Sequence, residues 1–346
     1  MKQKLSEIAD ITMGQSPLSG CYNSDGIGTP FLQGCTTFGR IHPSYDTWTT
    51  QFSKSANKDD VLFTIRAPVG DVNLCQRFTA IGRGLASIHA TKVNPKYLFY
   101  LLEGNKSAFT SASSGTIYQS INKDKLYNVV LNVHDSLTQQ HIVDTIGTID
   151  DLIEKNEEII ANARSLINAF YDTIIVETGI SILKDFFVIT IGRTPPTKES
   201  KWFSSSSRGN VKWLSIKDMA QNSTYIFETS QFLTNDALKK FNIPIVKEGD
   251  VLLSFKLTVG RTAIAGANMV TNEAIACFKA NPEYRNYLFC YLQRCNFLSD
   301  GDNTSSIGKA VNSTIIRNFP FVIPSKESLD TFNKETHSLF ELIKLK

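Results

Sequence analysis

The sequence predicts a mixed α/β (α+β) protein with two similar tandem domains, separated by long antiparallel coiled-coil helices around a pseudo-twofold axis. Three observations predict this architecture. A repeat covers most of the chain, short β-like runs alternate with turn residues in both copies, and a heptad pattern follows the first copy. The length of 346 residues is about twice that of a usual domain and agrees with this interpretation.

The repeat consists of five pairs of similar segments, which occur in the same order in both halves of the chain and at nearly the same offset. The first pair is Ile11–Pro17 (ITMGQSP) with Ile189–Pro195 (ITIGRTP), and the second is Asp60–Thr64 (DVLFT) with Asp250–Ser254 (DVLLS). The other pairs are Val69-Gly70 with Val259-Gly260, Tyr97–Phe99 with Tyr287–Phe289, and Asn128–Leu131 with Asn318–Phe321. This duplication predicts the same fold twice, at residues 1–135 and 177–325.

Each copy follows the same order of elements. Short strands come first, interrupted by Gly-, Pro-, Asn- and Ser-rich turns such as 26–30 and 204–210. A short apolar helix is predicted at 95–103 and again at 284–294. A loop of small residues, a last strand and a long helix complete each copy.

The first long helix, predicted at 136–176, carries a heptad seam. The seam residues alternate spacings of four and three, and they are Ile142, Ile146, Ile149, Ile153, Asn156, Ile160, Ala163, Ile167, Phe170 and Ile174. A single Asn in such a seam usually fixes register or orientation. Because a helix of about 40 residues is long for one globular core, the pattern favours a partner helix.

The second long helix, predicted at 326–346, has the same phase and is shorter. Its apolar positions are the counterparts, in the second copy, of the first four seam positions, and they are Phe332, Thr336, Leu339 and Ile343. An antiparallel partner of this length leaves Ile142, Ile146, Ile149 and Ile153 without an intramolecular cover. We expect another subunit to cover this stripe.

The charges divide the chain into two basic blocks and one acidic block. The net charge is +3 for residues 1–135, −5 for 136–176 and +5 for 177–325. The paired carboxylates Asp150 and Asp151 are interpreted as a solvated helix face. Basic blocks alone are a weak indication of nucleic-acid binding.

The sequence lacks the common catalytic and phosphate-binding motifs. GxxxxGK(S/T), GxGxxG, HExxH, GxSxG and CxxC are all absent. The six cysteines have no zinc-ligand spacing and are expected to be reduced thiols. No apolar run approaches the roughly 20 residues of a membrane span. We therefore expect a cytoplasmic binding protein that is not an enzyme and holds no metal.

With these features, the sequence resembles the specificity (S) subunit of type I restriction–modification systems. Gly14–Pro17 and Gly192–Pro195 look like that family's start of a target recognition domain. Pro30–Gly34 and Trp213–Asp218 are also similar to the family, and each precedes a strand that begins like Gly-Asp-Val-Leu. The stretch from Ser113 to Ile142 is similar to the family's small-residue loop, strand and helix entry. The resemblance covers essentially the whole chain.

The resemblance implies a non-catalytic DNA reader with two lobes, lobe one (residues 1–135) and lobe two (residues 177–325). Each lobe would read one half of a bipartite site in double-stranded DNA. The long helices would space the lobes and dock two modification (M) subunits, through Ile142, Ile146, Ile149, Ile153 and Asn156. The family carries S-adenosylmethionine on the M subunits, and ATP and Mg on restriction (R) subunits, so no cofactor is expected on this chain. No membrane partner is implied.

Base-edge readers are expected among the polar side chains of loops. In lobe one the candidates are Gln33, Thr36, Thr37, Arg40, Arg66, Tyr118 and Gln119. In lobe two they are Ser215, Lys217, Lys256, Arg261, Lys309 and Asn312. The sequence leaves one alternative open, a two-lobed scaffold that binds proteins or ligands without DNA specificity.

Overall fold

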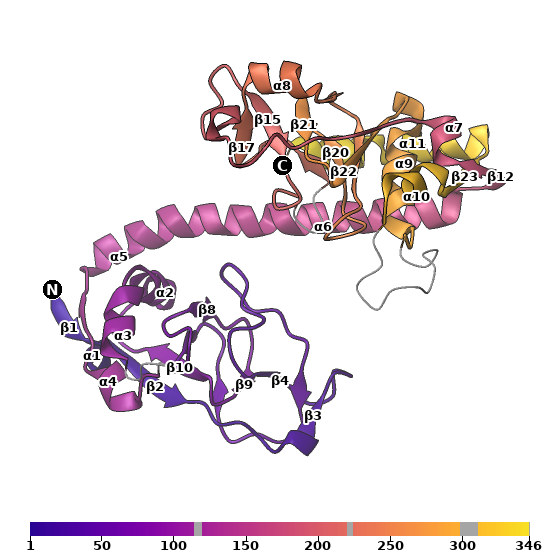
Figure 1. Ribbon diagram of the computed structural model, residues 1–346. Helices are drawn as coiled ribbons and strands as arrows, with labels where there is room; N and C mark the ends of the chain where they lie inside the picture. The colour runs from indigo at the N-terminus through magenta and orange to yellow at the C-terminus, as the bar shows by residue number, and fades with distance from the viewer. Residues whose placement is uncertain (114–119, 220–223, 298–310, 346) are drawn as a thin grey trace. The chain divides into compact units, whose positions relative to one another are not determined.

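The computed structural model describes residues 1–113, 120–219, 224–297 and 311–345 (Figure 1). The chain divides into two compact units, Met1–Lys155 and Asn156–Lys346. The boundary falls inside the long helix, so each half of that helix belongs to one unit. The sequence had predicted the whole helix as a separate spacer between the domains.

The described residues of unit 1 form three small sheets. Their strands are β1 (Lys2–Lys4), β2 (Ala9–Met13), β3 (Tyr22–Asn23), β4 (Thr29–Leu32), β5 (Trp48–Thr49), β6 (Ser55–Ala56), β7 (Val61–Thr64), β8 (Val72–Leu74), β9 (Thr79–Ile81), β10 (Leu85–Ala90) and β11 (Val130–Asn132). The sheet orders are β1-β11, β2-β10-β7-β8 and β3-β5-β4-β9-β6. All pairs are antiparallel except β4 with β9.

Unit 2 repeats these sheets. Its strands are β12 (Glu177–Ile182), β13 (Val188–Ile191), β14 (Phe203–Ser204), β15 (Val211–Leu214), β16 (Tyr225–Ile226), β17 (Gln231–Leu233), β18 (Ile245–Val246), β19 (Val251–Ser254), β20 (Thr262–Ala265), β21 (Met269–Thr271), β22 (Ile275–Lys279) and β23 (Pro320–Pro324). The orders are β12-β23, β13-β22-β19-β20-β16 and β14-β17-β15-β21-β18. Even the parallel pair returns, as β15 with β21. The predicted duplication of one fold is confirmed, and unit 2 adds β16 to the shared pattern.

The short apolar helices lie where the repeat placed them, as α2 (Pro95–Gly104) and α9 (Pro282–Arg294). Both begin with a proline, whose fixed φ suits the first helical turn. The Asn94 side chain caps α2 by accepting from two backbone amides. The repeated aromatic faces of these helices are buried in the unit cores, with Tyr97 and Tyr287 at 1% and 0% exposure. The remaining short helices are α1 (Leu5–Ile8), α3 (Lys106–Ala112), α4 (Lys123–Tyr127), α7 (Leu183–Phe186), α8 (Asn235–Phe241) and α10 (Ser313–Asn318).

The first long helix contains a π turn that the heptad pattern did not reveal. It consists of α5 (Ser136–Ile142), the π turn Val143–Gly147 and α6 (Thr148–Ile174). A π turn takes up more residues than an α turn and so rotates the faces of the helix on either side of it. The prediction of one unbroken seam is therefore wrong at its start. Ile142 packs against the core of unit 1 instead of continuing the seam.

The second long helix, α11 (Lys326–Leu345), runs antiparallel to the unit 2 half of α6 (Figure 1). Just beyond the end of α6 and just before the start of α11, the Ser325 amide donates to the Val176 carbonyl at 2.7 Å. Farther along, the rings of Tyr171 and Phe332 are 5.9 Å apart. Ala163 and Ile167 of α6 and Phe340 and Ile343 of α11 are buried in one cluster. The seam from the middle of the helix onward thus has the partner that the heptads predicted.

Candidate nucleic-acid interface

In unit 1, the loops that follow four strands are hydrogen-bonded to one another. The Gly84 amide donates to the Gln33 carbonyl at 3.1 Å, and the Ile65 amide donates to the Gly84 carbonyl at 3.0 Å. The Gln15 amide donates to Ile81 at 2.9 Å. These bonds join the loops after β2, β4, β7 and β9. We call this group the strand-end loops of unit 1, and they are residues 14–17, 33–34, 65–71 and 82–84.

Unit 2 builds the same group of loops. The Phe255 amide donates to the Ala274 carbonyl at 2.9 Å, and the Arg193 amide donates to Thr271 at 2.9 Å. Each bond is the counterpart of one in unit 1. The strand-end loops of unit 2 are residues 192–195, 215–219, 255–261 and 272–274. Binding residues are often found on loops that a rigid scaffold positions, so these repeated loops are the candidate recognition site.

The repeated glycine of the opening motif is required by the close approach of two loops. A Cβ atom on Gly14 would collide with the carbonyl oxygen of Gly82, and one on Gly192 with that of Thr271. The resemblance identified these glycines as family motifs. The structure gives their physical reason, because only glycine allows the loop backbones to lie against each other.

The loops after β7 and β19 have a fixed shape in both units. The hydroxyls of Thr64 and Ser254 each donate to the carbonyl four residues later and accept from the amide seven residues later. Gly70 and Gly260 both have a φ of 94°. At equivalent positions on these loops lie two exposed cations, Arg66 and Lys256. The loops therefore present one exposed basic side chain each on a preformed backbone.

The predicted readers fall into distinct groups. Arg66, Lys217 and Lys256 are exposed on strand-end loops, and their side chains make no hydrogen bond or ion pair with the described residues. The Gln33 side chain is also exposed there, and its Oε1 accepts from the Ser16 hydroxyl at 2.8 Å. The remaining predicted readers are bonded within the protein, follow directly after a strand-end loop or lie outside the described residues.

Two predicted readers in lobe two are bonded within the protein. The Arg261 guanidinium donates to the carbonyls of Ile216 and Met219, at 3.2 and 2.6 Å, and so joins two strand-end loops. The Ser215 hydroxyl donates to Asp218 at 2.7 Å. Burial opposes ionisation of Asp218, but hydrogen bonds from the Ser230 and Ser215 region outweigh it and lower the pKa of Asp218. Arg261 and Ser215 therefore stabilise the loops of lobe two, a role that the sequence did not indicate.

Other predicted readers cap a helix, follow a strand-end loop or lie outside the described residues. The Asn312 side chain caps α10 by accepting from the backbone amides of Thr314 and Ile315. Thr36 and Thr37 lie on the loop between β4 and β5, directly after the strand-end residues 33–34, and Thr36 is exposed. Three predicted readers lie outside the described residues, and they are Tyr118, Gln119 and Lys309.

Sequence reasoning missed two pairs of loop residues. In unit 1 the backbone amide of Arg83 donates to the Ser16 hydroxyl at 3.2 Å. In unit 2 the Thr194 hydroxyl donates to the Glu273 carboxylate. Ser16 and Thr194 occupy one place in the repeated opening motif, and this repeat was a signal that could have identified them. Arg83 and Glu273 occupy equivalent positions of the repeat and differ in charge.

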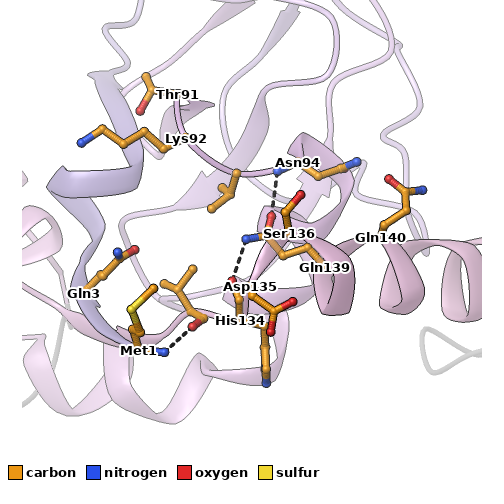
Figure 2. A pocket seen from close by; sticks show the side chains of 12 residues that line it. Met1, Gln3, Thr91, Lys92, Asn94, His134, Asp135, Ser136, Gln139 and Gln140 are labelled. Carbon is orange, nitrogen blue, oxygen red and sulfur yellow. Dashed lines mark hydrogen bonds between the residues drawn. The ribbon is translucent and has the colours of Figure 1, made fainter.

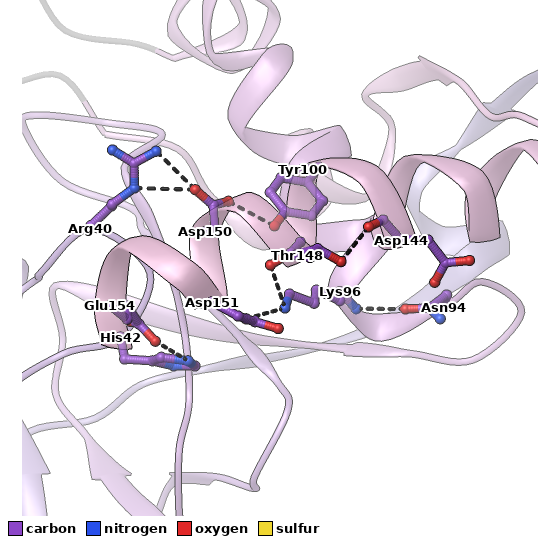
Figure 3. A network of polar contacts seen from close by, with 11 residues as sticks. Arg40, His42, Asn94, Lys96, Tyr100, Asp144, Thr148, Asp150, Asp151 and Glu154 are labelled. Atoms are coloured by element: carbon purple, nitrogen blue, oxygen red, sulfur yellow. Dashed lines mark hydrogen bonds and ion pairs between the residues drawn. The ribbon is translucent and has the colours of Figure 1, made fainter. Parts of the chain in front are cut away.

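Arg40 has an acidic partner on the long helix (Figure 3). Its Nε and Nη2 donate to Asp150 Oδ1 at 3.1 and 2.8 Å, and the Tyr100 hydroxyl donates to Asp150 Oδ2 at 2.8 Å. Burial, followed by the bond to this carboxylate, raises the pKa of Tyr100 and keeps its hydroxyl a donor. Asp150 is only 5% exposed, so its interpretation as a solvated residue is wrong. Arg40 is thus occupied within unit 1.

Further polar contacts join the same helix to unit 1 (Figure 3). The Lys96 ammonium lies 2.6 Å from Asp151, and His42 Nε2 lies 3.7 Å from Glu154. The Lys96 chain also covers Gly147 of the π turn. We call Arg40, Tyr100 and Asp150, with these flanking pairs, the polar clamp. It fixes the face of the helix that lies against unit 1.

A stripe of apolar side chains lies exposed on the helix near the clamp. Ile146, Ile149 and Leu152 are 44%, 55% and 59% exposed. Ile153 and Asn156 are half-buried. We call Ile146, Ile149 and Leu152 the apolar stripe. The expectation of exposed seam residues holds for Ile146 and Ile149. It fails for Ile142, which packs against the core of unit 1 next to the π turn, and for Ile153, which is half-buried.

A polar hollow lies beside the start of α5 (Figure 2). Its groups are bonded to one another: the Met1 amino group donates to Val133, and the Gln139 amide bridges Asn94 and His134. Within the described ranges no group of three or more His, Cys, Asp or Glu side chains could hold a metal. No helix in the same ranges is long and apolar enough to cross a membrane.

Fold and site together define a binding protein built from two tandem copies of one recognition module. The family model for the type I restriction modification DNA specificity domain matches residues 1–163 and 176–337. The chain belongs to this family.

Relatives and a solved structure agree with this assignment. A Methanocaldococcus jannaschii protein assigned as the specificity subunit of the type I restriction enzyme MjaX is 38% identical over 162 residues, which is 45% of this chain and 38% of the relative. The MjaVIII specificity subunit of the same organism is 22% identical over 72% of this chain and 64% of its own length. The matches thus span less than two thirds of these relatives. The S subunit of M. genitalium has a similar fold, with a TM-score of 0.63 at 14% identity, over 99% of this chain and 95% of that one.

Proposed function

We propose that this chain is the sequence-reading subunit of a type I restriction–modification complex and has no catalytic site of its own. Each lobe would read one half of a bipartite site in double-stranded DNA. The observation that carries the proposal is the duplicated set of strand-end loops. Two copies of one loop scaffold suit two half-sites of one duplex, because the same backbone can approach DNA twice.

The side chains on the two scaffolds differ, which supports two different half-sites. Gln33 in lobe one corresponds to Ser215 in lobe two, and Arg83 corresponds to Glu273. Arginine pairs best with guanine, glutamine with adenine, and glutamate accepts from the cytosine amino group. Arg66 and Lys256 are cations in both lobes and suit a phosphate or a guanine.

The apolar stripe supports docking of modification subunits. Fully burying one Leu or Ile side chain contributes roughly 1.5–3 kcal/mol, so a stripe of three favours association. Two M subunits would bring S-adenosylmethionine and the methylation chemistry, and R subunits would bring ATP and Mg. This chain would only determine which DNA sequence the complex binds.

Mapping of methylated adenines across the genome, with and without the gene for this chain, tests the proposal. We expect one bipartite motif to lose its methylation when the gene is removed. The alternative, a scaffold for proteins or ligands, predicts an unchanged methylation map and no sequence-selective, salt-dependent binding to duplex DNA.

A further inference from the structure

The tip of one strand-end loop in unit 2 carries an exposed leucine in a strained conformation. Leu257 is 94% exposed, the highest value among the large apolar side chains of the described residues. Its φ is 62°, in the left-handed region that a side chain disfavours. The Thr258 amide donates to the Lys256 carbonyl at 2.7 Å, which closes a three-residue γ-turn around Leu257. The γ-turn with positive φ is rare and strained.

The leucine stands on a rigid base. Phe255, two residues earlier, is 1% exposed and bonds through its amide to Ala274. The Ser254 hydroxyl donates to the Thr258 carbonyl and accepts from the Arg261 amide, so it bonds to two positions of the loop. Arg261, at the end of the loop, is bonded to the neighbouring strand-end loop. The strain at the tip is therefore imposed by a well-bonded surrounding, and such strain is concentrated at functional positions.

A cation accompanies the apolar tip. Lys256 precedes Leu257, and its ammonium lies 5.7 Å from the centre of the Phe255 ring. In unit 1 the equivalent loop keeps the cation, as Arg66, but carries Ala67 and Pro68 in place of Leu257 and Thr258. The shared cation suits a phosphate or base that both lobes contact. The leucine is a feature of lobe two alone.

We propose that Leu257 contacts the apolar surface of a base in the half-site that lobe two reads. Apolar side chains recognise DNA in two ways, by covering the thymine methyl group or by entering between base pairs. Both place a projecting apolar side chain against a base. In this loop the exposed Lys256 beside the leucine suits a backbone phosphate. The inference rests on the proposed function, because it assigns one contact within the proposed interface.

The test uses the full chain assembled with its modification subunits, on the methylated motif that genome mapping identifies. The main variant is Leu257→Gly, because glycine accepts a positive φ and removes the side chain. We expect its affinity for the full site to fall about tenfold or more, since a buried leucine contributes that much. Affinity for unrelated duplex DNA should stay unchanged, and the midpoint of thermal unfolding should not fall. The matched control is Ile180→Ala on β12, where an exposed isoleucine (74%) lies outside all the strand-end loops.

Modified DNA distinguishes the two kinds of base contact. If Leu257 covers a thymine methyl, replacing that thymine by uracil lowers the wild-type affinity to that of Leu257→Gly and has no further effect on the variant. If Leu257 enters a base step, uracil has no effect, and a 2-aminopurine at that step brightens only with the wild type.

Equal affinity of Leu257→Gly and the wild type for the full site would overturn the inference. So would an equal loss of affinity on the full site and on unrelated DNA, because a base contact cannot act without sequence. Failure of the proposed function is recognised separately, since the wild type itself would then show no sequence-selective binding.

Discussion

The surroundings of each loop arginine determine what its removal would change. The Arg66 side chain is exposed and has no polar partner among the described residues. The Arg261 guanidinium binds two carbonyl oxygens and joins two loops. Arg40 binds a buried carboxylate on the long helix. One residue type thus has three different roles, and only the first leaves the side chain available to DNA.

We predict that Arg66→Ala and Lys256→Ala weaken binding of the assembled complex to its site. If the lost contact is to a base, the loss should be about 1–3 kcal/mol and one position of the motif should relax. If it is to a phosphate, all sequences should weaken alike and the salt slope should fall by about 1. Titrations of specific and unrelated duplexes at several salt concentrations distinguish these results.

Arg261→Ala serves as the contrasting variant for this experiment. It should lower the free energy of unfolding, because two hydrogen bonds from a charged donor are lost. Normal DNA affinity of both Arg66→Ala and Lys256→Ala would remove these residues from the interface.

The residue types were predictable from the sequence, but their partners were not. Arg66 and Lys256 could be found because they lie at equivalent positions of matching segments. Asn312 directly precedes a short helix, and an Asn at that position is itself a capping signal in the sequence. The bond of Arg261 to Ile216 joins residues 45 positions apart, and no local pattern records such a contact.

At the scale of elements, the duplication predicted the fold and the heptads predicted the helix pair. Both signals are periodic and extend over many residues, so single exceptions do not hide them. The π turn could not be predicted in this way. It changes the phase of the helix within one turn, while the apolar spacing of Ile142, Ile146 and Ile149 reads as unbroken. The contact between Lys96 and Gly147, which lies at this turn, is long-range.

We predict that the polar clamp depends on its buried carboxylate. Asp150→Ala should lower the free energy of unfolding of the first unit by about 1–3 kcal/mol, because Asp150 accepts three hydrogen bonds at 5% exposure. Asp151→Ala is the matched control. Its carboxylate is 67% exposed, and surface ion pairs contribute only about 0–1 kcal/mol.

Denaturant unfolding, followed by a probe in the first unit, measures both variants. A double-mutant cycle of Arg40→Ala and Asp150→Ala should give a coupling energy, since the two side chains are in direct contact. Equal destabilisation by Asp150→Ala and Asp151→Ala would contradict the role given to the buried carboxylate.

We predict that the apolar stripe is needed for assembly with the modification subunits. Ile149→Asp combined with Leu152→Asp places two charges on the exposed apolar face and should abolish co-purification of M subunits. The fold should survive, because the two side chains are already more than half exposed. Ala161→Asp, at an exposed position of the same helix, should leave assembly intact. Normal assembly of the double variant would show that M subunits bind elsewhere.

At the scale of the whole molecule, each unit has a buried core of its own. The buried clusters of each unit contain residues of that unit alone. Both lobes carry a positive net charge, and the helical segment 136–176 is negative. Part of this negative charge is used within the units, because Asp150 binds Arg40 and Asp172 binds Arg294. This separation suggests that one unit can be exchanged without rebuilding the other.

We therefore predict that exchange of lobe two with that of another family member changes only one half of the methylated motif. The structure also predicts where the exchange should be made. Ala163 and Ile167, on the first long helix, are buried against unit 2 with Phe340 of α11. A chimera exchanged over residues 156–346 keeps these partners together. One exchanged over 177–325 packs two native helices against a foreign core.

Both chimeras should methylate a motif with one altered half, because each lobe has its own strand-end loops. The second chimera should unfold at a lower temperature, since mismatched core packing typically costs about 1–3 kcal/mol, whereas the first should unfold like its parents. Methylation maps and thermal unfolding of the two proteins measure these outcomes. A change in both halves of the motif would mean that the lobes do not read DNA independently, and equal stability of the chimeras would mean that the helix seam does not belong to the core of unit 2.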